Sequence, residues 1–185
     1  MRIISGILKG RTLNKKLPSG VRPTTDAARE AIFNILSNAF DFEEVSFLDL
    51  FAGSGAMGME AISRGCRNVY FNDKSRKVIG YIKSNLEVFG VRSEDYTISN
   101  MDSYKLLSDG IGKGNKFDII FIDPPYKDKY IYQLIEGILK NELLENRGLI
   151  VIEFPKNDVF ELSEELSIYK EKVSGMSRYL FLEYV

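Results

Sequence analysis

The sequence predicts an α/β protein built on a mostly parallel sheet. Short apolar runs alternate along the chain with segments whose apolar residues recur at helical spacing, which is typical of repeated βαβ units. The run at 119–122 reads Ile-Ile-Phe-Ile, so its strand would be buried on both faces, as in a parallel sheet. Two strands joined through Ser174 and Gly175 predict a closing hairpin. We therefore expect a Rossmann-like fold with a seven-stranded sheet and a C-terminal antiparallel hairpin.

The composition is typical of one soluble domain with a short appendage. The chain has 185 residues, of which 44% are hydrophobic and 28% charged. No apolar run reaches the length of a membrane span, and Lys9 and Arg11 come too early for a signal peptide. These features predict a cytoplasmic protein without a membrane partner. One cysteine and no histidine exclude an internal disulfide, a Cys/His zinc site and a His-activated nucleophile, and we expect no metal.

The start of the chain is strongly basic. Residues 1–22 contain six basic residues and no acid, whereas the rest of the chain contains 19 basic and 26 acidic residues. This asymmetry predicts a localised phosphate-binding surface; a solvated, loosely ordered terminus is the alternative. Interspersed apolar residues and glycines predict short strands and turns. We expect residues 1–22 to form a basic β-hairpin appendage on a main domain of residues 23–185. The basic residues concerned are Arg2, Lys9, Arg11, Lys15, Lys16 and Arg22.

A helix is predicted from about residue 26 to residue 39. Thr25 or Asp26 can cap it, and an acid in the first turn suits the helix dipole. Its apolar residues follow helical spacing, so one face would be buried. Capping does not account for the arginine at position 22. We place Arg22 and two further phosphate-binding candidates, Thr24 and Arg29, around the cap rather than on the apolar face.

The strand at 45–50 leads into a glycine-rich loop and a helix over about 56–64. Gly53 and Gly55 let the backbone turn sharply and lie against a ligand. The next strand, at 69–71, is followed by Asp73, twenty positions after Gly53, and an acid there can accept both hydroxyls of a ribose. Because loop, helix, strand and acid come in the required order, we predict a nucleoside-binding βαβ unit.

The third predicted strand, at 96–99, follows a helix over 75–89. It ends at Asn100, Met101 and Asp102, where an adenine ring would lie if the ribose is held by Asp73. Asn100 or Asp102 could accept a hydrogen bond from the adenine amino group, with Met101 against the ring. A simple strand-to-helix turn explains any one of these residues equally well.

The fourth predicted strand, the apolar run at 119–122, ends at Asp123, Pro124, Pro125 and Tyr126. The two prolines impose a stiff, extended turn at the carboxyl end of the strand, where ligands of open α/β sheets bind. The Asp123 carboxylate and the Pro124 carbonyl are acceptors, and Tyr126 offers a flat face. This combination suits the exocyclic amino group of a nucleobase. A rigid Pro-Pro loop with an incidental acid is the alternative.

The rest of the chain continues the alternation. A Gly/Lys-rich stretch at 110–116 predicts a solvated connection, and a helix follows Lys129. A fifth strand is predicted at 148–153, and the closing hairpin would use 168–173 and 178–184.

The glycine loop and the acid after the second strand fit two classes of nucleotide-dependent enzyme. Gly53-x-Gly55-x-x-Gly58 followed by Asp73 also satisfies the dinucleotide fingerprint of NAD-dependent dehydrogenases. Against this class, Asp49 would repel a pyrophosphate but could hold an ammonium group, the chain is short for a cofactor and a substrate domain, and no proton donor for hydride chemistry is evident. S-adenosylmethionine has a ribose, an adenine, an α-ammonium and a methyl group on a sulfonium, and so it meets all the requirements.

The whole chain resembles the RsmD family of 16S (small-subunit) ribosomal RNA guanine-N2 methyltransferases, which have the class I S-adenosylmethionine-dependent fold. Asn100-Met101-Asp102 lies in a segment that varies in this family, so the adenine contact stays open. The matching segments are Arg2-Ile3-Ile4-Ser5-Gly6, Gly10-Arg11, Arg22-Pro23-Thr24-Thr25-Asp26 with Arg29-Glu30, Phe51-Ala52-Gly53-Ser54-Gly55, Asp123-Pro124-Pro125-Tyr126 and Glu171-Lys172-Val173-Ser174-Gly175.

The resemblance implies methyl transfer to the N2 of a guanine, in free small-subunit RNA or in a ribosomal particle. Asp123 and the Pro124 carbonyl would hold the amino group, Tyr126 would stack on the base, and the glycine loop with Asp49 and Phe51 would bind the cofactor. The basic residues of the appendage would hold RNA phosphates. An amino methyltransferase acting on adenine N6 or on a protein glutamine, and a non-enzymatic RNA-binding protein, are the alternatives.

Overall fold

The computed structural model describes residues 1–13, 16–19, 24–111, 114–124 and 129–185. Within these residues seven strands form one sheet in the order β3-β2-β1-β4-β5-β7-β6. The helices and strands are α1 (Asp26–Ala39), β1 (Ser46–Asp49), α2 (Ala56–Ser63), β2 (Asn68–Asn72), α3 (Arg76–Phe89), η1 (Ser93–Asp95), β3 (Tyr96–Ser99), α4 (Ser103–Lys105), η2 (Leu106–Gly110), β4 (Phe117–Ile122), α5 (Lys129–Lys140), β5 (Leu144–Pro155), β6 (Leu166–Ser174) and β7 (Ser177–Tyr184).

The sheet confirms the predicted fold class. Strands β1 to β5 pair in parallel, and β7 pairs antiparallel with both β5 and β6. The antiparallel hairpin therefore folds back so that the last strand, β7, lies between β5 and β6. Strand β5 begins at Leu144, earlier than the apolar pattern predicts, because the segment before Gly148 also pairs with β4 at Phe117.

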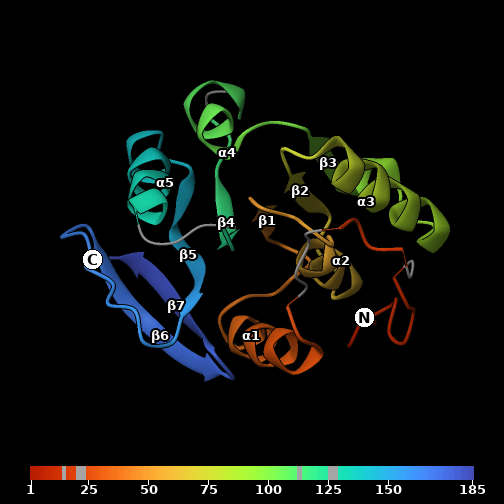
Figure 1. Ribbon diagram of the computed structural model, residues 1–185, viewed down its shortest axis with the longest axis horizontal. Coiled ribbons are helices and arrows are strands. Elements are labelled where there is room, and N and C mark those ends of the chain that lie inside the picture. Colours follow the sequence, from red (N-terminus) through yellow and green to blue (C-terminus); the bar gives the residue numbers. More distant parts are fainter. Residues whose placement is uncertain (14–15, 20–23, 112–113, 125–128) are drawn as a thin grey trace.

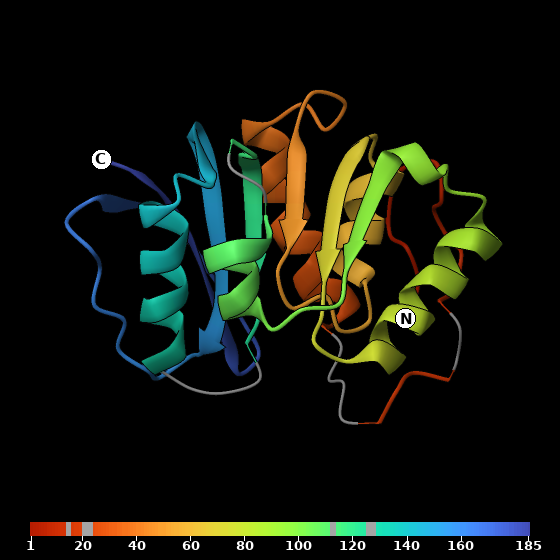
Figure 2. The ribbon, with the colours of Figure 1, turned by 90° about the horizontal axis from the view of Figure 1, so that it is seen from above.

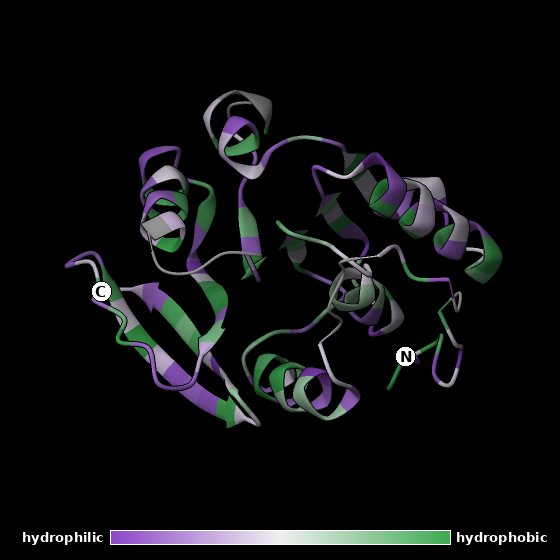
Figure 3. Cartoon of the chain, viewed as in Figure 1, coloured by the Kyte–Doolittle hydropathy of each residue, from purple (hydrophilic) through white to green (hydrophobic). Residues whose placement is uncertain are grey.

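Helices cover both faces of the sheet. Figure 1 shows α1 and α2 on one side of the strands and α4 and α5 on the other. The first core contains apolar residues of α1, α2 and α3, and the second contains those of α5 and of the turn after α4. Green and purple alternate around α3 and α5 in Figure 3, as expected for helices with one buried face. None of the described helices combines the length and the apolar character that a membrane span requires.

The strand order reverses between β1 and β4. Leu48 of β1 pairs with Tyr70 of β2 on one side and with Ile120 of β4 on the other. The connection after β1 therefore leads to β2 in one direction, and the connection after β4 leads to β5 in the opposite direction. Such a switch point at the carboxyl edge is where open α/β sheets bind ligands. In Figure 2 strand β1 points toward the bottom, so this carboxyl edge is the lower edge of the view.

The N-terminal segment is fastened to the main domain. Arg2 and Thr12 form an antiparallel bridge, and the Ile3 N–H donates to the Arg11 carbonyl at 2.9 Å, so the chain folds back on itself as a minimal hairpin. Ile3, Leu8 and Leu13 are buried in the same core as α1 and α2. We call residues 1–13 the N-terminal arm.

Candidate active site

The glycine loop after β1 has the sharp backbone turn that its sequence predicts. Gly53 and Gly55 have φ values of 50° and 72°, a left-handed conformation that glycine adopts without steric cost. The Gly53 N–H donates to Asp73 Oδ2 at 3.0 Å, and helix α2 begins directly after Gly55. Phe51, at the start of the loop, is half-buried against the second core. The loop and the acid after β2 are therefore held together.

Asp73 is well placed to bind a diol. Its two carboxylate oxygens accept the N–H groups of Gly53 and Ser75, at 3.0 and 2.8 Å. These bonds fix the orientation of the carboxylate and leave each oxygen a further lone pair. The side chain is half-exposed at the carboxyl edge. Its position and its two acceptor oxygens fit the hydroxyls of a ribose.

Asp49 lies beneath the loop rather than at its surface. The residue is 1% exposed, and its Oδ2 accepts the Gly58 N–H in the first turn of α2 at 3.1 Å. Burial raises its pKa to about 7, against the effect of the Gly58 hydrogen bond, and the charge of Asp73 adds to the rise. The expected direct contact with an ammonium group is therefore not available in this conformation, because the carboxyl is covered by the turn that it supports.

Asn72 is a residue of this edge that sequence reasoning missed. It is fully buried, and its amide nitrogen donates to the Leu50 carbonyl at 3.2 Å while its Oδ1 accepts the Met101 N–H at 3.2 Å. One side chain thus ties together the ends of β1, β2 and β3. The signal available in the sequence was an asparagine directly after a predicted strand.

The three candidates for the adenine contact all lie at the end of β3, in different roles. The Asn100 side chain donates to the Asp73 carbonyl at 2.8 Å. Met101 is half-buried, and Asp102 caps α4 by accepting the Tyr104 N–H at 3.0 Å. The Asn100 amide nitrogen is therefore engaged with the Asp73 backbone, and Asp102 uses one of its two carboxylate oxygens for the cap.

Asp123 and Pro124 follow the last residue of β4 and are half-exposed. Because Asp49 of β1 pairs with Phe121 of β4, these two residues stand at the strand end beside the glycine loop. Helices α4 and α5 are linked near this edge: the Tyr104 hydroxyl donates to the Tyr130 carbonyl at 3.1 Å, and the centroids of the two rings are 5.7 Å apart. The other two residues of the predicted motif, Pro125 and Tyr126, lie outside the described residues.

Most of the described residues predicted to bind phosphate lie at the surface, in the arm or shortly after it. Arg2, Lys9, Arg11 and Lys16 are exposed and Thr24 is half-exposed. Arg11 is held against α3, since its guanidinium donates to the Phe89 carbonyl at 2.9 Å and lies over the Phe89 ring. Arg2 lies 3.9 Å from Asp26. Lys15 and Arg22 fall outside the described part of the chain.

Arg29 is a correction to this set. Its side chain is 0% exposed and lies 3.7 Å from Glu60 of α2, and it also donates to Asp26 and to the Arg2 carbonyl. It cannot contact RNA from this position. The residue faces inward because Glu60, 31 positions later in the chain, supplies a buried counter-charge, and no local pattern reveals that partner.

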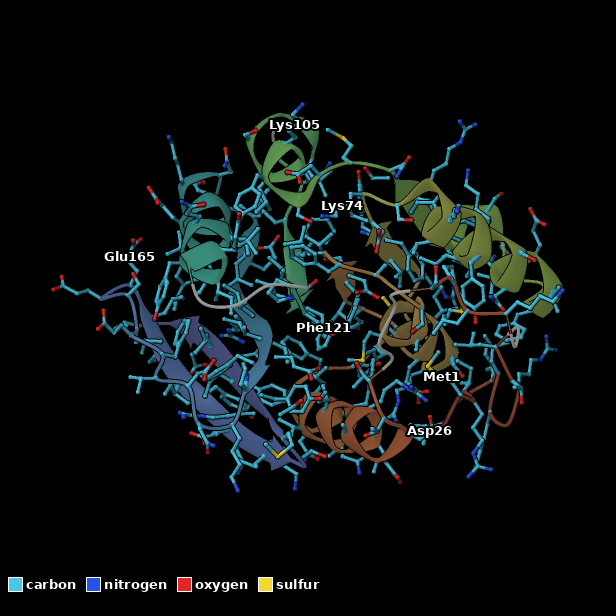
Figure 4. All side chains as sticks on the ribbon, in the orientation of Figure 1. Met1, Asp26, Lys74, Lys105, Phe121 and Glu165 are labelled. Atoms are coloured by element: carbon cyan, nitrogen blue, oxygen red, sulfur yellow. The ribbon has the colours of Figure 1, made fainter. Side chains whose placement is uncertain are left out.

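Glu60 also fastens the arm. Its carboxylate accepts the N–H groups of Ile4 and Ser5 at 2.8 and 3.0 Å. Ser63, one turn later in α2, accepts the Leu8 N–H through its hydroxyl at 2.9 Å and the Ile7 N–H through its carbonyl. In Figure 4 Met1 lies beside α2 and Asp26 at the end of α1. The basic arm is therefore a positioned surface and not a loose terminus.

Two surface hollows lie away from this edge. One of about 690 Å³ lies between the arm and the C-terminal end of α1, and one of about 530 Å³ lies between α5 and residues 160–165. Neither is lined by a residue predicted for the cofactor or the amino group. In the described residues no group of three or more His, Cys, Asp or Glu side chains is arranged to hold a metal.

Comparison with known proteins identifies the family. The model of the family described as "Conserved hypothetical protein 95" matches residues 1–183. Ribosomal RNA small subunit methyltransferase D of Haemophilus influenzae is 34% identical over 179 residues, which cover 97% of this chain and 91% of that protein. The Escherichia coli protein of the same name is 32% identical over 180 residues, covering 97% and 87%.

The chain belongs to the RsmD family. This confirms the resemblance inferred from the arm, the glycine loop and the motif after β4, and it makes the chain a member of a family of ribosomal RNA methyltransferases.

Solved structures agree with the RsmD assignment. The structure named "Putative methyltransferase yhhF from Escherichia coli" has a TM-score of 0.86 and 31% identity, covering 100% of this chain and 97% of that one. Magnesium protoporphyrin IX methyltransferase of Synechocystis, solved with bound SAM, has a TM-score of 0.67 at 15% identity, covering 86% and 79%. At that identity the likeness shows the shared class I fold alone.

Proposed function

We propose that this protein transfers the methyl group of S-adenosylmethionine to the exocyclic N2 of a guanine in small-subunit ribosomal RNA. The observation that carries the proposal is the adjacency of two sites at one switch point. Asp73 and the glycine loop stand at the ends of β2 and β1, and Asp123 stands at the end of β4, the other neighbour of β1. A nucleoside-type ligand and an amino-bearing base would thus meet across neighbouring strands.

The residues of the cofactor side match the chemistry of S-adenosylmethionine. The half-exposed carboxylate of Asp73 suits the ribose hydroxyls, and the left-handed turn at Gly53 and Gly55 allows close approach to the backbone. When bound, S-adenosylmethionine supplies an electrophilic methyl group on a positively charged sulfur. Asp49 would then act through the loop, by holding the first turn of α2 in place, and not by direct contact.

The residues after β4 would position the acceptor. Asp123 would accept a hydrogen bond from the exocyclic amino group and stabilise the positive charge that develops on that nitrogen, and it would take the proton afterwards. The Pro124 carbonyl would accept the second amino hydrogen, which leaves the nitrogen lone pair directed at the methyl group. Pro125 and Tyr126 keep their predicted roles, in the stiff turn and in stacking on a base drawn out of its helix or loop.

The arm would bind the RNA backbone. Arg2 and Lys9 of the arm are exposed, as is Lys16, which follows the arm. The arm N–H groups donate hydrogen bonds to Glu60 and Ser63, and these bonds hold residues 1–13 in one place relative to α2. Phosphate contacts from such a surface add affinity that falls with salt and give no base specificity. Specificity must then come from the base site.

The test is a labelling experiment. Unmodified small-subunit RNA, and ribosomal particles that contain it, are incubated with S-adenosylmethionine labelled in the methyl group, and the modified nucleotide is mapped and its methyl position identified. We expect one N2-methylguanine. Label on adenine N6 or on a glutamine of a translation factor, with none on ribosomal RNA, would contradict the proposal. Absence of S-adenosylmethionine binding in calorimetry would favour a non-enzymatic RNA-binding protein.

A further inference from the structure

A second carboxylate stands next to Asp123 at the carboxyl edge. Strands β4 and β5 are parallel neighbours, and their last parallel pair is Ile122 with Ile152. Asp123 and Glu153 are the next residues of the two strands, and neighbouring strands are about 4.8 Å apart. Glu153 is half-exposed. It has no role in the function proposed above.

The carboxylate of Glu153 is oriented from one side and has one oxygen without a partner. Its Oε1 accepts the Ser177 hydroxyl of β7 at 2.6 Å. Its Oε2 is buried and accepts no hydrogen bond within 3.5 Å from any described residue. A buried carboxylate oxygen in this condition is costly, and such atoms are rare in folded proteins. An oxygen kept in this state next to a reaction site is suited to a ligand.

Tyr179 lies near both carboxylates. It is buried on β7, opposite Glu153. Burial raises the pKa of its phenol, and the charges of Glu153 and Asp123 raise it further, so the phenol lies within electrostatic reach of both. The phenol therefore keeps its proton, and Tyr179 cannot add a third negative charge to this cluster.

Two adjacent carboxylates select one nucleobase. On its Watson–Crick edge guanine carries the N2 amino group next to N1–H, so it offers donors at both positions. In adenine and cytosine the ring nitrogen next to the amino group carries a lone pair, and in glutamine the amide nitrogen is next to a carbonyl oxygen. A carboxylate beside the amino group would therefore bind the guanine edge and repel the other three.

We propose that Glu153 accepts a hydrogen bond from the N1–H of the target guanine while Asp123 accepts one from its amino group. Glu153 thereby determines the choice of base. This inference rests on the function proposed above. A small rotation of the half-exposed Glu153 side chain brings an oxygen toward a base held at Asp123. Ser177 keeps the carboxylate in place from the other side.

The experiment uses an RNA segment that carries the mapped target nucleotide as guanine or as 2-aminopurine. 2-Aminopurine keeps the exocyclic amino group and lacks both N1–H and O6, so the change in the guanine-to-2-aminopurine rate ratio between the wild type and a Glu153 variant reports the contact to Glu153. The wild-type protein should methylate the guanine RNA about 10-fold faster or more at equal RNA occupancy, because the analogue leaves the carboxylate facing a lone pair. In Glu153→Gln the ratio should fall to within about 3-fold, since an amide can either donate or accept.

Glu171→Gln is the matched control. Glu171 pairs with Arg178 on the outer hairpin, and its substitution should leave the ratio at the wild-type value. Because a role in hairpin stability would lower both rates together, the ratio separates base recognition from a structural effect. Glu153→Asp, which keeps the charge, should retain the preference for guanine and provides a second variant if Glu153→Gln does not fold.

The outcomes are distinct. Equal wild-type rates on guanine and 2-aminopurine would overturn the assignment of Glu153 and leave the proposed methyl transfer standing. A Glu153→Gln ratio equal to that of the wild type would do the same. Absence of any guanine product with the wild-type protein would overturn both.

Discussion

The guanidinium of Arg29 lies 3.7 Å from the carboxylate of Glu60, and neither side chain is exposed to solvent. The pair joins α1 to α2, and Glu60 at the same time accepts the Ile4 and Ser5 N–H groups of the arm. Two helices and the basic arm thus share one buried charged centre. The placement of the proposed RNA-binding surface therefore depends on the same contacts as the stability of the domain.

Replacing Glu60 by glutamine should destabilise the protein strongly. The substitution leaves the buried Arg29 guanidinium with the half-exposed Asp26 as its one remaining carboxylate partner among the described residues, and breaking a buried pair from one side costs up to about 3–5 kcal/mol. Urea unfolding should show a lower midpoint with a similar slope. The control is Glu30→Gln, at an exposed position of α1, the helix that carries Arg29. It should change the free energy of unfolding by no more than about 0.5 kcal/mol. Equal effects of the two substitutions would contradict the importance of the buried pair.

Asp49 should make stability depend on pH. Its folded-state pKa is raised from 3.8 to about 7, so between these values the folded protein binds a proton that the unfolded chain releases. The stabilising contribution is complete below about pH 4 and is lost as pH rises through about 7, with a total of roughly 2–4 kcal/mol. Asp49→Asn should remove this fall, as measured by urea unfolding from pH 5 to pH 8. A variant with the pH profile of the wild type would show that Asp49 does not titrate in this range, and Glu44→Gln, at an exposed site, serves as control.

Two glycine-to-alanine substitutions should act in opposite directions. A Cβ on Gly58 would overlap the ring of Phe71, whereas a Cβ on Gly80 would meet nothing within 4 Å. Gly58→Ala should lower the free energy of unfolding by about 1–3 kcal/mol because helix α2 must move off strand β2. Gly80→Ala, inside helix α3, should raise it by about 0.5–1 kcal/mol. Stabilisation by both would show that α2 does not pack on β2 as described.

Asp123→Ala should abolish methyl transfer without abolishing cofactor binding. The residue stands at the end of β4 and not in the glycine loop or at the end of β2, which are proposed to hold the ribose, so S-adenosylmethionine affinity in calorimetry should stay within about 3-fold. Transfer should fall by about 100-fold or more, because the group that orients the amino nitrogen and accepts its proton is lost. Asp41→Ala, an exposed acid near the start of β1, is the control. Turnover at the wild-type rate would remove Asp123 from the mechanism.

Neutralising Lys9 in the arm and Lys16 just after it should flatten the salt dependence of RNA binding. Each phosphate contact that is lost should reduce the slope of log affinity against log salt by about 0.7–0.9, so Lys9→Gln combined with Lys16→Gln should reduce it by up to about 1.8. Lys140→Gln with Lys170→Gln, exposed on α5 and β6, controls for net charge. An unchanged slope in the arm variant would place the RNA surface elsewhere. Filter binding or anisotropy at several salt concentrations gives these slopes.

Much of the site could be predicted from the sequence because its signals are local. Strand, glycine loop, helix and acid follow one another within 25 residues from Asp49 to Asp73, and the structure brings them together at one edge. The residues whose roles were missed or wrongly predicted depend on partners far apart in the chain. Arg29 faces inward because of Glu60, and Glu153 meets Ser177 because β7 lies next to β5. Helical periodicity and motif spacing contain no information on such pairings.

The position of β7 has a consequence for synthesis on the ribosome. In the described sheet β6 pairs with β7 and not with β5, so a growing polypeptide that has not yet reached Ser177 has no partner for β6. Ser177, whose hydroxyl holds Glu153, also belongs to this late segment. A nascent chain that ends before Ser177 therefore lacks both the strand that pairs with β6 and the hydroxyl that fixes the Glu153 carboxylate.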